Sequence, residues 1–356
     1  MIKRLFNSLR QQKYTLQDTK NVASMYQHLL KTGLYTVTPE IVYRDVNQLS
    51  PHLLKYRHTQ KQEHRWLATP KQAIKRAYFS GADRIRLKGT GEATILAKRK
   101  NKDPVFIAPE SGKVIKPFPA WAKPDHYNKI RAEISGILPT PKHRLVSGGT
   151  ILEEQYLQGV SLEEMPCPEA TRIVKNILSC IFMAQRDSLR APDQTLFTKA
   201  TSDPNLDRRV QDDLLSLCNM DNVYRLFDAP CLPAHGDLAP DNIIVANSKP
   251  LVIDLEPKCV GHWPCWLDAA FLLLNYDCAG YWRGDYDFEI STLLNPTKIM
   301  KSEYQHIHTD LAVATLLLSH LNNKDWQRKW HTAFKPARDA FLRTPFHAGA
   351  SASVAP

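Results

Sequence analysis

The sequence predicts an α+β chain in which a small antiparallel sheet precedes a mostly helical part, with a helical extension at the N-terminus. Three observations support this prediction. Short β-prone runs separated by glycine or proline turns occupy residues 84–118. Helical periodicity dominates beyond Gly159. Within that helical part, residues 233–254 are an exception, because they have the pattern of a loop, a strand, a turn and a second strand.

Residues 1–75 are predicted to form a basic and largely helical extension. Apolar residues recur at helical spacing over residues 2–9, with basic residues on the other face. Such a helix suits docking on its own domain or peripheral contact with an anionic membrane surface, and the sequence leaves both open. A second helix is expected over residues 19–31, ended by Gly33.

The next elements form the predicted sheet and its helical partner. Strands are expected at residues 84–87, 94–97, 105–108 and 113–118, followed by a helix over 126–138 and two strands at 143–147 and 150–156. Beyond them, helices are expected at 168–190, 204–227, 265–278, 302–322 and 324–343, and residues 346–356 form a small, polar tail expected to be disordered.

The composition is that of a folded chain. Its 356 residues are 43% hydrophobic and 23% charged, near the globular average, and this length favours two or three connected substructures. No apolar stretch approaches the ~20 residues that span a bilayer, so no transmembrane helix is expected. The basic start lacks a continuous apolar segment, which favours a cytoplasmic protein. Seven cysteines, confined to residues 167–278, favour reduced thiols.

Charge is distributed unevenly along the chain. Residues 1–116 carry a net charge of +15 and the remainder carries −4. This asymmetry favours an anionic partner for the N-terminal part, although a merely solvated basic surface accounts for the same charges. We expect no nucleic acid as partner, because the sequence has no recognised nucleic-acid-binding module and no aromatic residues interleaved with the basic ones.

The densest chemical signal is AHGDLAPDNIIVANSKPLVIDLEP, residues 234–257. Asn242 follows Asp237 by five positions and precedes a β-run, a turn, a second β-run and Asp254. A hairpin with Asn242 at its start and Asp254 after its end would bring an amide oxygen and a carboxylate together. Mg²⁺ prefers such oxygen ligands, with phosphates and waters completing the octahedron. This order of elements therefore indicates phosphoryl transfer, with Asp237 orienting a hydroxyl nucleophile.

The same segment resembles the catalytic loop of the protein-kinase-like fold, in the variant used by aminoglycoside phosphotransferases, choline kinases and related small-molecule kinases. Protein kinases carry HRD followed by DFG, and this chain has HGD followed by DLE. The resemblance implies a bilobal fold with an N-lobe over 76–157 and a C-lobe over 158–345, and ATP with Mg²⁺ as the cofactor. It also implies Asp237 as catalytic base and Asn242 and Asp254 as Mg²⁺ ligands.

Three further residues of this region have roles that the resemblance implies. Glu256 is either an additional metal ligand or a surface carboxylate. His235 shapes the loop and is neither acid nor base. Asp268 follows Gly261 and Pro264 in a pattern similar to the family's DxExxxxGxPxxDLA, and it should tie the backbone amides of the catalytic loop together.

Upstream, the resemblance implies a strand lysine that grips the α and β phosphates and a helix glutamate that holds this lysine. The run KVIKPF supplies Lys116, and Glu133 lies seventeen residues later. Lys98 is the alternative lysine, if the sheet is offset by one hairpin.

The resemblance also places the adenine and the phosphate-covering loop. The run ILEEQYLQGVSLEE, residues 151–164, resembles the segment that links the two lobes, where backbone groups of Glu154, Tyr156 and Leu157 would bind the adenine. Gly89 and Gly91 of GTGEA are assigned to the phosphate loop, 25 residues before Lys116, and PESGK at 109–113 is the alternative.

The acceptor is predicted to be a small molecule or a glycan. Fourteen positions separate Asp254 from Asp268, too few for the activation segment of a regulated protein kinase. The basic N-terminal third favours a sugar of an anionic or membrane-associated glycoconjugate. An aminoglycoside-type antibiotic is the alternative acceptor, and a nucleotide-binding pseudokinase is the alternative without catalysis. The oligomeric state is not predicted.

The run CxxHxxC at Cys259, His262 and Cys265 offers metal-ligand residue types. Structural zinc usually needs four ligands at compact spacing, and the loop between Asp254 and Asp268 already accounts for this segment. We therefore favour a packing role for the motif. Trp263 and Trp266 in the same loop are expected to be packing residues, with stacking on a sugar ring as the alternative.

Overall fold

The computed structural model describes residues 16–38, 41–44, 83–97, 103–188, 208–217, 231–257, 259–264, 267–286, 313 and 324–343. The chain forms two compact units. Unit 1 comprises Met1–Asp125, Thr140–Ser161 and Ile244–Leu251, and unit 2 comprises His126–Pro139, Leu162–Ile243 and Val252–Pro356. Unit 1 is built on an antiparallel sheet and unit 2 is mostly helical, so the predicted α+β class is confirmed.

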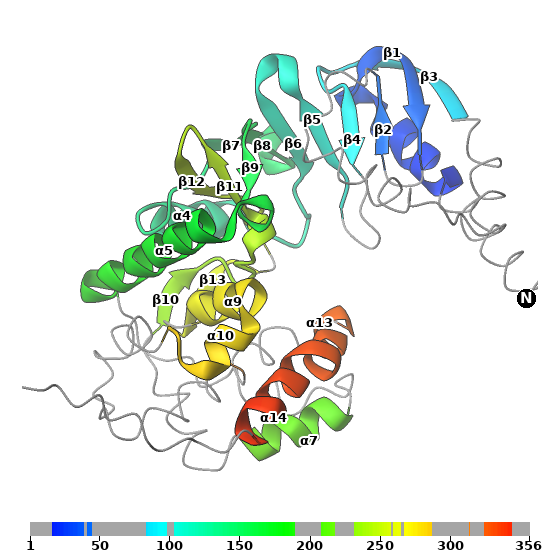
Figure 1. Cartoon of the computed structure of the whole chain (residues 1–356). Coiled ribbons are helices and arrows are strands. Elements are labelled where there is room, and N and C mark those ends of the chain that lie inside the picture. Colours follow the sequence, from blue (N-terminus) through cyan, green and yellow to red (C-terminus); the bar gives the residue numbers. More distant parts are fainter. Residues whose placement is uncertain are drawn as a thin grey trace, which may run out of the picture. The chain divides into compact units, whose positions relative to one another are not determined.

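The main sheet of unit 1 has eight antiparallel strands in the order β3-β1-β2-β4-β5-β6-β8-β7 (Figure 1). Its elements are β1 (Lys31–Val37), β2 (Ile41–Tyr43), β3 (Asp83–Thr90), β4 (Ile95–Ala97), β5 (Val105–Ala108), β6 (Lys113–Pro117), β7 (His143–Val146) and β8 (Ile151–Gln155), with the short helical turns η1 (Gln27–Leu29), η3 (Pro109–Ser111) and η4 (Ser147–Gly149).

A second, three-stranded sheet has the order β12-β11-β9. Its strands are β9 (Val160–Ser161), β11 (Ile243–Ala246) and β12 (Lys249–Val252). The β11–β12 hairpin turns at Asn247 and Ser248, whose φ angles are +49° and +60°. Two successive positive φ angles are the geometry of a type I′ turn, whose twist matches that of the flanking strands. The predicted strand–turn–strand pattern is therefore confirmed.

The predicted helical character of residues 1–75 is wrong for residues 31–37 and 41–43. Residues 16–25 are helical, but β1 and β2 follow and join the same sheet as β4. Gly33, expected to end a helix, lies inside β1. Tyr35 and Val37 are buried while Leu34 is exposed, and this alternation suits a strand rather than a helix. The predictions for residues 1–15 and 45–75 lie outside the described residues.

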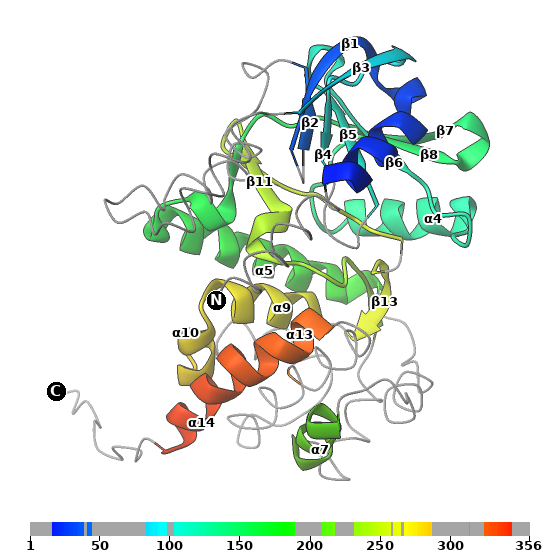
Figure 2. The ribbon, with the colours of Figure 1, turned by 90° about the vertical axis from the view of Figure 1, so that its right-hand side faces the viewer.

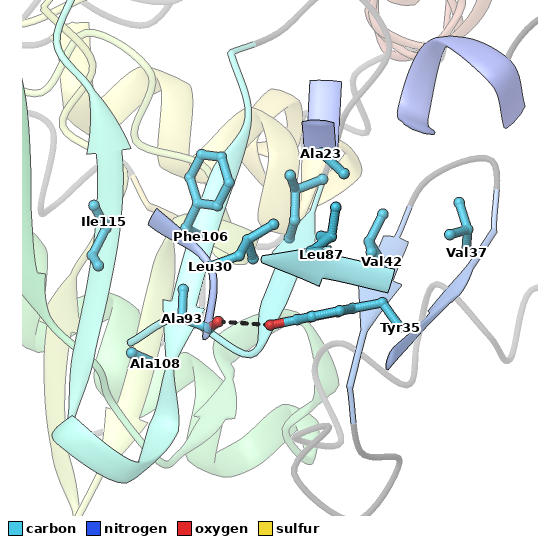
Figure 3. Close-up of a cluster of buried hydrophobic side chains, with 11 residues drawn as sticks. Ala23, Leu30, Tyr35, Val37, Val42, Leu87, Ala93, Phe106, Ala108 and Ile115 are labelled. Atoms are coloured by element: carbon cyan, nitrogen blue, oxygen red, sulfur yellow. Dashed lines mark hydrogen bonds between the residues drawn. The ribbon is translucent and has the colours of Figure 1, made fainter. Parts of the chain in front are cut away.

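One face of the main sheet packs against the helix at residues 16–25 (Figures 1 and 3). We call it the helical face. The helix contributes Ala23 and the partly buried Val22 to this core. The Tyr35 hydroxyl lies 2.6 Å from the Lys31 carbonyl oxygen and 3.2 Å from that of Ala93. The strand side chains of this face are Tyr35, Val37, Val42, Leu87, Leu96, Phe106, Ala108 and Ile115.

The opposite face of the sheet carries a separate apolar cluster. Ile41, Tyr43, Ile95 and Ile107 are its buried members, and Tyr156 packs against them. Because side chains alternate along each strand and the register aligns Ile107 with Val114, Lys116 lies on this face as well. We call this surface the second face.

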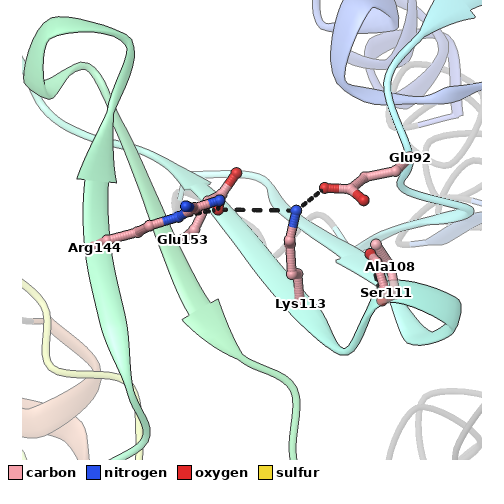
Figure 4. A network of polar contacts seen from close by, with 6 residues as sticks. All are labelled: Glu92, Ala108, Ser111, Lys113, Arg144 and Glu153. Carbon is pink, nitrogen blue, oxygen red and sulfur yellow. Dashed lines mark hydrogen bonds and ion pairs between the residues drawn. The ribbon is translucent and has the colours of Figure 1, made fainter.

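A ladder of alternating charges crosses the helical face beyond the core (Figure 4). Lys113 pairs with Glu92 and lies 4.0 Å from Glu153, which accepts a 2.7 Å hydrogen bond from Arg144 Nε. The ladder joins the segment before β4 to β6, β8 and β7. Its members are partly exposed, so each pair contributes little to stability by itself.

Unit 2 contains helices and one two-stranded sheet, β10 (Cys231–Ala234) with β13 (Gly261–Pro264). The apolar helix α9 is buried from Leu267 to Leu274, and Figure 2 shows α10 beside both α9 and α14. The helical elements are α4 (Pro124–Ser135), η5 (Leu162–Glu164), α5 (Cys167–Ser188), α7 (Arg208–Leu217), η6 (Pro240–Asn242), α9 (Leu267–Tyr276), α10 (Cys278–Arg283), α13 (Lys324–Lys329), the π-helical η9 (Trp330–Phe334) and α14 (Lys335–Arg343).

The expected helices at 168–190, 265–278 and 324–343 therefore match α5, α9 and the run from α13 to α14. The expected helix at 302–322 and the tail at 346–356 lie outside the described part, apart from residue 313. Within the described residues, no helix combines the length and the apolar character needed to cross a bilayer.

Candidate active site

The loop after β10 is tied down by a buried carboxylate. The backbone N–H groups of His235 and Gly236 donate to Asp268 at 2.7 and 2.9 Å. Asp268 is buried in the first turn of α9. Gly236 has a φ of +75°, and a Cβ atom there would lie 2.1 Å from the Cys259 carbonyl oxygen. Only glycine fits this turn, and the predicted tying role of Asp268 is confirmed.

The charge state of Asp268 reflects two opposed effects. Burial raises the pKa of this carboxyl group, and the N–H groups of His235 and Gly236 act in the opposite direction because they stabilise the carboxylate. The carboxylate accepts both hydrogen bonds, so the loop is anchored by a buried group.

His235 links the loop to the strand that precedes Asp254. The imidazole is fully buried, and its Nδ1 accepts the N–H of Asp237 at 3.2 Å. The proton therefore lies on Nε2, which donates to the Ile253 carbonyl oxygen at 2.8 Å. Both ring nitrogens are thus engaged with the backbone, so His235 shapes the loop as predicted.

Asn242 completes the connection between the two halves of the motif. Its Nδ2 donates to the Asp237 carbonyl oxygen at 2.8 Å, and its own carbonyl oxygen accepts the N–H of Ile253 at 2.9 Å. Ile253 is thus held at both of its backbone groups. Asp254 follows with a φ of +62°, a left-handed conformation that is uncommon for aspartate and marks a constrained position.

The donor atoms at this position suit a hard cation. Because Nδ2 of Asn242 is engaged, Oδ1 is the atom of this amide that can act as a ligand, and Asp254 adds a carboxylate. In the described part of the chain, no cluster of three or more His, Cys, Asp and Glu side chains could hold a metal by itself. This donor set fits Mg²⁺, which takes further ligands from phosphates and water.

Glu256 lies two residues beyond Asp254 and is half-buried. Its carbonyl oxygen accepts the N–H groups of Cys259 and Val260 at 2.9 and 3.1 Å. These bonds fold the segment after Asp254 into a turn. The role of Glu256 as a metal ligand stays a prediction.

The residues of the CxxHxxC run have other partners. His262 Nε2 lies 2.8 Å from Glu133 Oε2, and Trp263 Nε1 donates to the Cys259 carbonyl oxygen at 2.8 Å. The packing role favoured for Cys259 and Trp263 agrees with these contacts. Cys265 and Trp266 lie outside the described residues.

Helix α4 runs along the segment that follows Asp254. The Tyr127 hydroxyl donates to the Leu255 carbonyl oxygen at 2.9 Å, and Ile130 and Ile134 pack against Leu255. Glu133 is on the same helix and contacts His262. The sequence did not predict the contact with His262, because the side-chain partner of a helix residue depends on which loop packs beside it. The pairing of Glu133 with Lys116 that the resemblance implies stays a prediction.

Lys116 pairs with Glu154 across β6 and β8, with 2.7 Å between Nζ and Oε2. Glu154 is buried, and Lys116 is 18% exposed. The register aligns Lys116 with Leu152 and Val114 with Glu154, so the two charged residues are diagonal neighbours on the second face. The sequence missed this pair because the register of β6 against β8 is set by tertiary contacts.

The adenine-binding prediction needs a correction at Glu154 and Tyr156. Glu154 lies within the sheet, where β8 pairs with both β6 and β7, so its backbone cannot serve a ligand. The Tyr156 N–H donates to the Gly112 carbonyl oxygen at 2.8 Å. Leu157 lies just beyond β8, and binding of the adenine by its backbone groups stays a prediction.

Gly89 and Gly91, predicted to form the phosphate-covering loop, lie close to neighbouring backbone. A Cβ atom on Gly89 would lie 2.0 Å from the Gln27 carbonyl oxygen, and one on Gly91 would lie 2.2 Å from that of Leu29. The Gly91 N–H donates a hydrogen bond to the Leu30 carbonyl oxygen at 3.2 Å. These glycines permit close backbone packing beside η1. Lys98, the alternative lysine, lies outside the described residues.

Comparisons with known proteins give matches only among solved structures. No family model matches the chain, and the search of curated proteins found no match. The chain is similar to a choline/ethanolamine kinase family protein from Mesorhizobium loti, at 14% identity over 81% of this chain and 95% of that one, with a TM-score of 0.47.

Two further solved structures illustrate the range of the matches. Choline kinase LicA from Streptococcus pneumoniae matches at 14% identity over 76% of this chain and 97% of its own, with a TM-score of 0.42. An aminoglycoside phosphotransferase from Alicyclobacillus acidocaldarius matches at 15% identity over 70% and 91%, with a TM-score of 0.41.

Proposed function

We propose that the chain is an ATP-dependent phosphotransferase that moves the γ-phosphate of Mg-ATP to an acceptor hydroxyl. The hydrogen-bonded convergence of the loop at Asp237 and Asn242 with the strand end at Asp254 is the observation that supports this proposal. Phosphoryl transfer asks a protein mainly for positioning and charge stabilisation, and this arrangement supplies both from rigid backbone.

Each residue of the loop has a distinct task in this proposal. Asp237 accepts the proton of the acceptor hydroxyl as it attacks. Asn242 Oδ1 and the Asp254 carboxylate hold Mg²⁺, with Glu256 as a further ligand. The ion, when bound, neutralises the charge that develops on the transferred phosphate. His235 and Asp268 keep the loop in place and take no part in proton transfer.

The nucleotide contacts assigned to unit 1 are also part of the proposal. Lys116 grips the phosphates, and the buried Glu154 carboxylate orients its ammonium group within the sheet. The apolar cluster around Ile95 and Ile107, against which Tyr156 packs, provides a surface for the adenine ring. Backbone groups of Leu157 bind the adenine edge.

We assign the acceptor to a sugar of an anionic glycoconjugate, soluble or membrane-associated. The net charge of +15 in residues 1–116 supports an anionic acceptor. A cationic aminoglycoside is the competing acceptor, and it would require an acidic binding surface.

The test is turnover that depends on Asp237. Purified protein is incubated with Mg-ATP and a library of sugars, glycans, amino alcohols and aminoglycosides, and phosphate transfer is measured for the wild type and Asp237→Asn. We expect transfer to one acceptor class, lost by about 10²–10⁴-fold in the variant. Equal rates in both proteins would contradict the proposal, and nucleotide binding without any transfer would identify a pseudokinase.

A further inference from the structure

The edge strand β3 presents a row of three cations, with a register irregularity between Leu87 and Thr90. Arg84, Arg86 and Lys88 are exposed, and the intervening Leu87 is buried in the core of the helical face. Alternation along the strand therefore places the three charges on the second face. Neighbours on one face of a strand are about 7 Å apart, so the row is about 14 Å long.

The surroundings of this row hold no compensating negative charge on the adjacent strand. The register aligns Arg84 with Thr36 and Arg86 with Leu34, and Thr32 is the next residue of β1 on this face. None of the three is acidic. Among the described residues, no side chain forms an ion pair or a hydrogen bond with the side chains of Arg84, Arg86 or Lys88. The row is thus a concentrated positive potential at the edge of the sheet.

The row shares its sheet face with Lys116. Directly paired residues on neighbouring strands lie on the same face of the sheet. Thr36 pairs with Tyr43, Tyr43 with Ile95, Ile95 with Ile107, and Ile107 with Val114 of β6. Five strand spacings of about 4.8 Å separate β3 from β6, so roughly 24 Å of this face lie between the row and Lys116. The twist of the sheet turns the row relative to Lys116 but keeps both on one surface.

This geometry suits a linear polyanion rather than a single phosphate group. A lone phosphate is bound by donors that converge on it, whereas these three cations are spread along one strand. Single-stranded nucleic acid is disfavoured, because it needs aromatic stacking platforms and the side chains of the adjacent strand β1 are Thr32, Leu34 and Thr36.

We propose that Arg84, Arg86 and Lys88 form a docking site for an acidic glycan chain, one that repeats carboxylate or phosphate groups and carries the acceptor hydroxyl. This inference rests on the proposed function for the reaction but concerns a separate surface. It names the acceptor class as a polymer or oligomer and gives the three cations on one exposed strand face a role.

The test measures binding without ATP, so it does not depend on turnover. The probe is an oligogalacturonate of about ten sugars, titrated into the full chain at two salt concentrations. The test variant carries Arg84→Gln, Arg86→Gln and Lys88→Gln. The matched control carries Arg172→Gln, Lys175→Gln and Arg208→Gln, which removes three exposed cations from unit 2. A third variant, Arg84→Lys with Arg86→Lys, preserves the charges.

We expect the β3 variant to bind the oligogalacturonate about 10-fold more weakly than the wild type, because three attractive charges are lost. The control and the lysine variant should bind within about 2-fold of the wild type, and wild-type binding should weaken as salt rises. Thermal melting of each variant checks its fold. Equal binding by the β3 variant and the control would overturn the proposal.

Three further probes separate the possible partners. Neutral dextran should not bind. Stronger binding of phosphatidylglycerol vesicles or of a 20-nucleotide oligothymidylate than of the oligogalacturonate, lost in the β3 variant, would assign the row to a membrane or to nucleic acid and would contradict the glycan. Asp237→Asn should bind the oligogalacturonate like the wild type. If that variant also retains turnover, the proposed function fails while the docking site stands.

Discussion

The loop of unit 2 and the sheet of unit 1 are each stabilised by a different kind of interaction. In the loop, buried side chains accept or donate to backbone groups, as Asp268 does for His235 and Gly236. In the sheet, the charged side chains pair mainly with one another at or near the surface, as Lys113 does with Glu92. Loss of a buried hydrogen bond between a side chain and the backbone is costly, because the remaining partner stays buried without a hydrogen bond. An exposed ion pair contributes little to stability. Substitutions should therefore have far larger effects in the loop than in the sheet.

The largest effect is expected from Asp268→Ala. The substitution leaves two buried N–H groups without their acceptor, each at a cost of about 1–3 kcal/mol, so the free energy of unfolding should fall by about 2–5 kcal/mol. Urea unfolding followed by circular dichroism measures the change. Asp125→Ala, an exposed aspartate in the first turn of α4, is the control and should change stability by less than about 1 kcal/mol. Equal losses in both variants would show that Asp268 is not the anchor.

An intermediate effect is expected from Glu154→Gln, which weakens the ion pair with Lys116 inside the sheet. The amide replaces the carboxylate that orients Lys116, and loss of a charge-assisted hydrogen bond corresponds to about a 10-fold lower kcat/KM for ATP. Glu133→Gln should reduce kcat/KM less, because Glu133 contacts His262. Steady-state kinetics at varied ATP concentration show which variant loses more kcat/KM. A larger loss in Glu133→Gln would support the pairing that the sequence suggests.

The smallest effect is expected from Tyr35→Phe in the helical face of the sheet. The hydroxyl bonds the Lys31 carbonyl oxygen, so its removal should lower stability by about 1 kcal/mol. Burial raises the pKa of Tyr35 to about 12. The folded state then keeps a proton that the unfolded chain loses near pH 10, so stability should fall as pH rises from about 10 to 12.

Urea midpoints measured between pH 9 and pH 11 test this dependence in reversible conditions. The loss of stability at high pH that Tyr35 causes should be absent in Tyr35→Phe. An identical slope of stability against pH in both proteins would show that Tyr35 does not carry it.

The same contrast explains what the sequence could predict. The loop from Asp237 to Asp254 has its partners a few residues apart or across one hairpin, so spacing and resemblance located its elements and foresaw the tie from Asp268. The pairs Lys116–Glu154 and Glu133–His262 depend on sheet register and on helix packing. Neither is encoded in local spacing.

The backbone contacts of two glycines and the first strands were missed for a related reason. Gly89 and Gly91 are required where two backbone segments touch, and a glycine in a β-prone run has the same local pattern whether it meets backbone or phosphate. Strand β2 has only three residues, and β1 and β2 are buried against partners in β3 and β4. Tertiary pairing therefore overrode a weak helical pattern.

The most direct measurement of the central claim is single-turnover transfer of the γ-phosphate at saturating Mg-ATP, compared between Asp237→Asn and Asp241→Asn. Asp241 is an exposed aspartate of the same loop, so the pair matches in chemistry and location. We predict that Asp237→Asn binds ATP normally but transfers at least about 100-fold more slowly, while Asp241→Asn transfers at nearly the wild-type rate. Similar rates in the two variants would contradict the assignment of this loop to phosphoryl transfer.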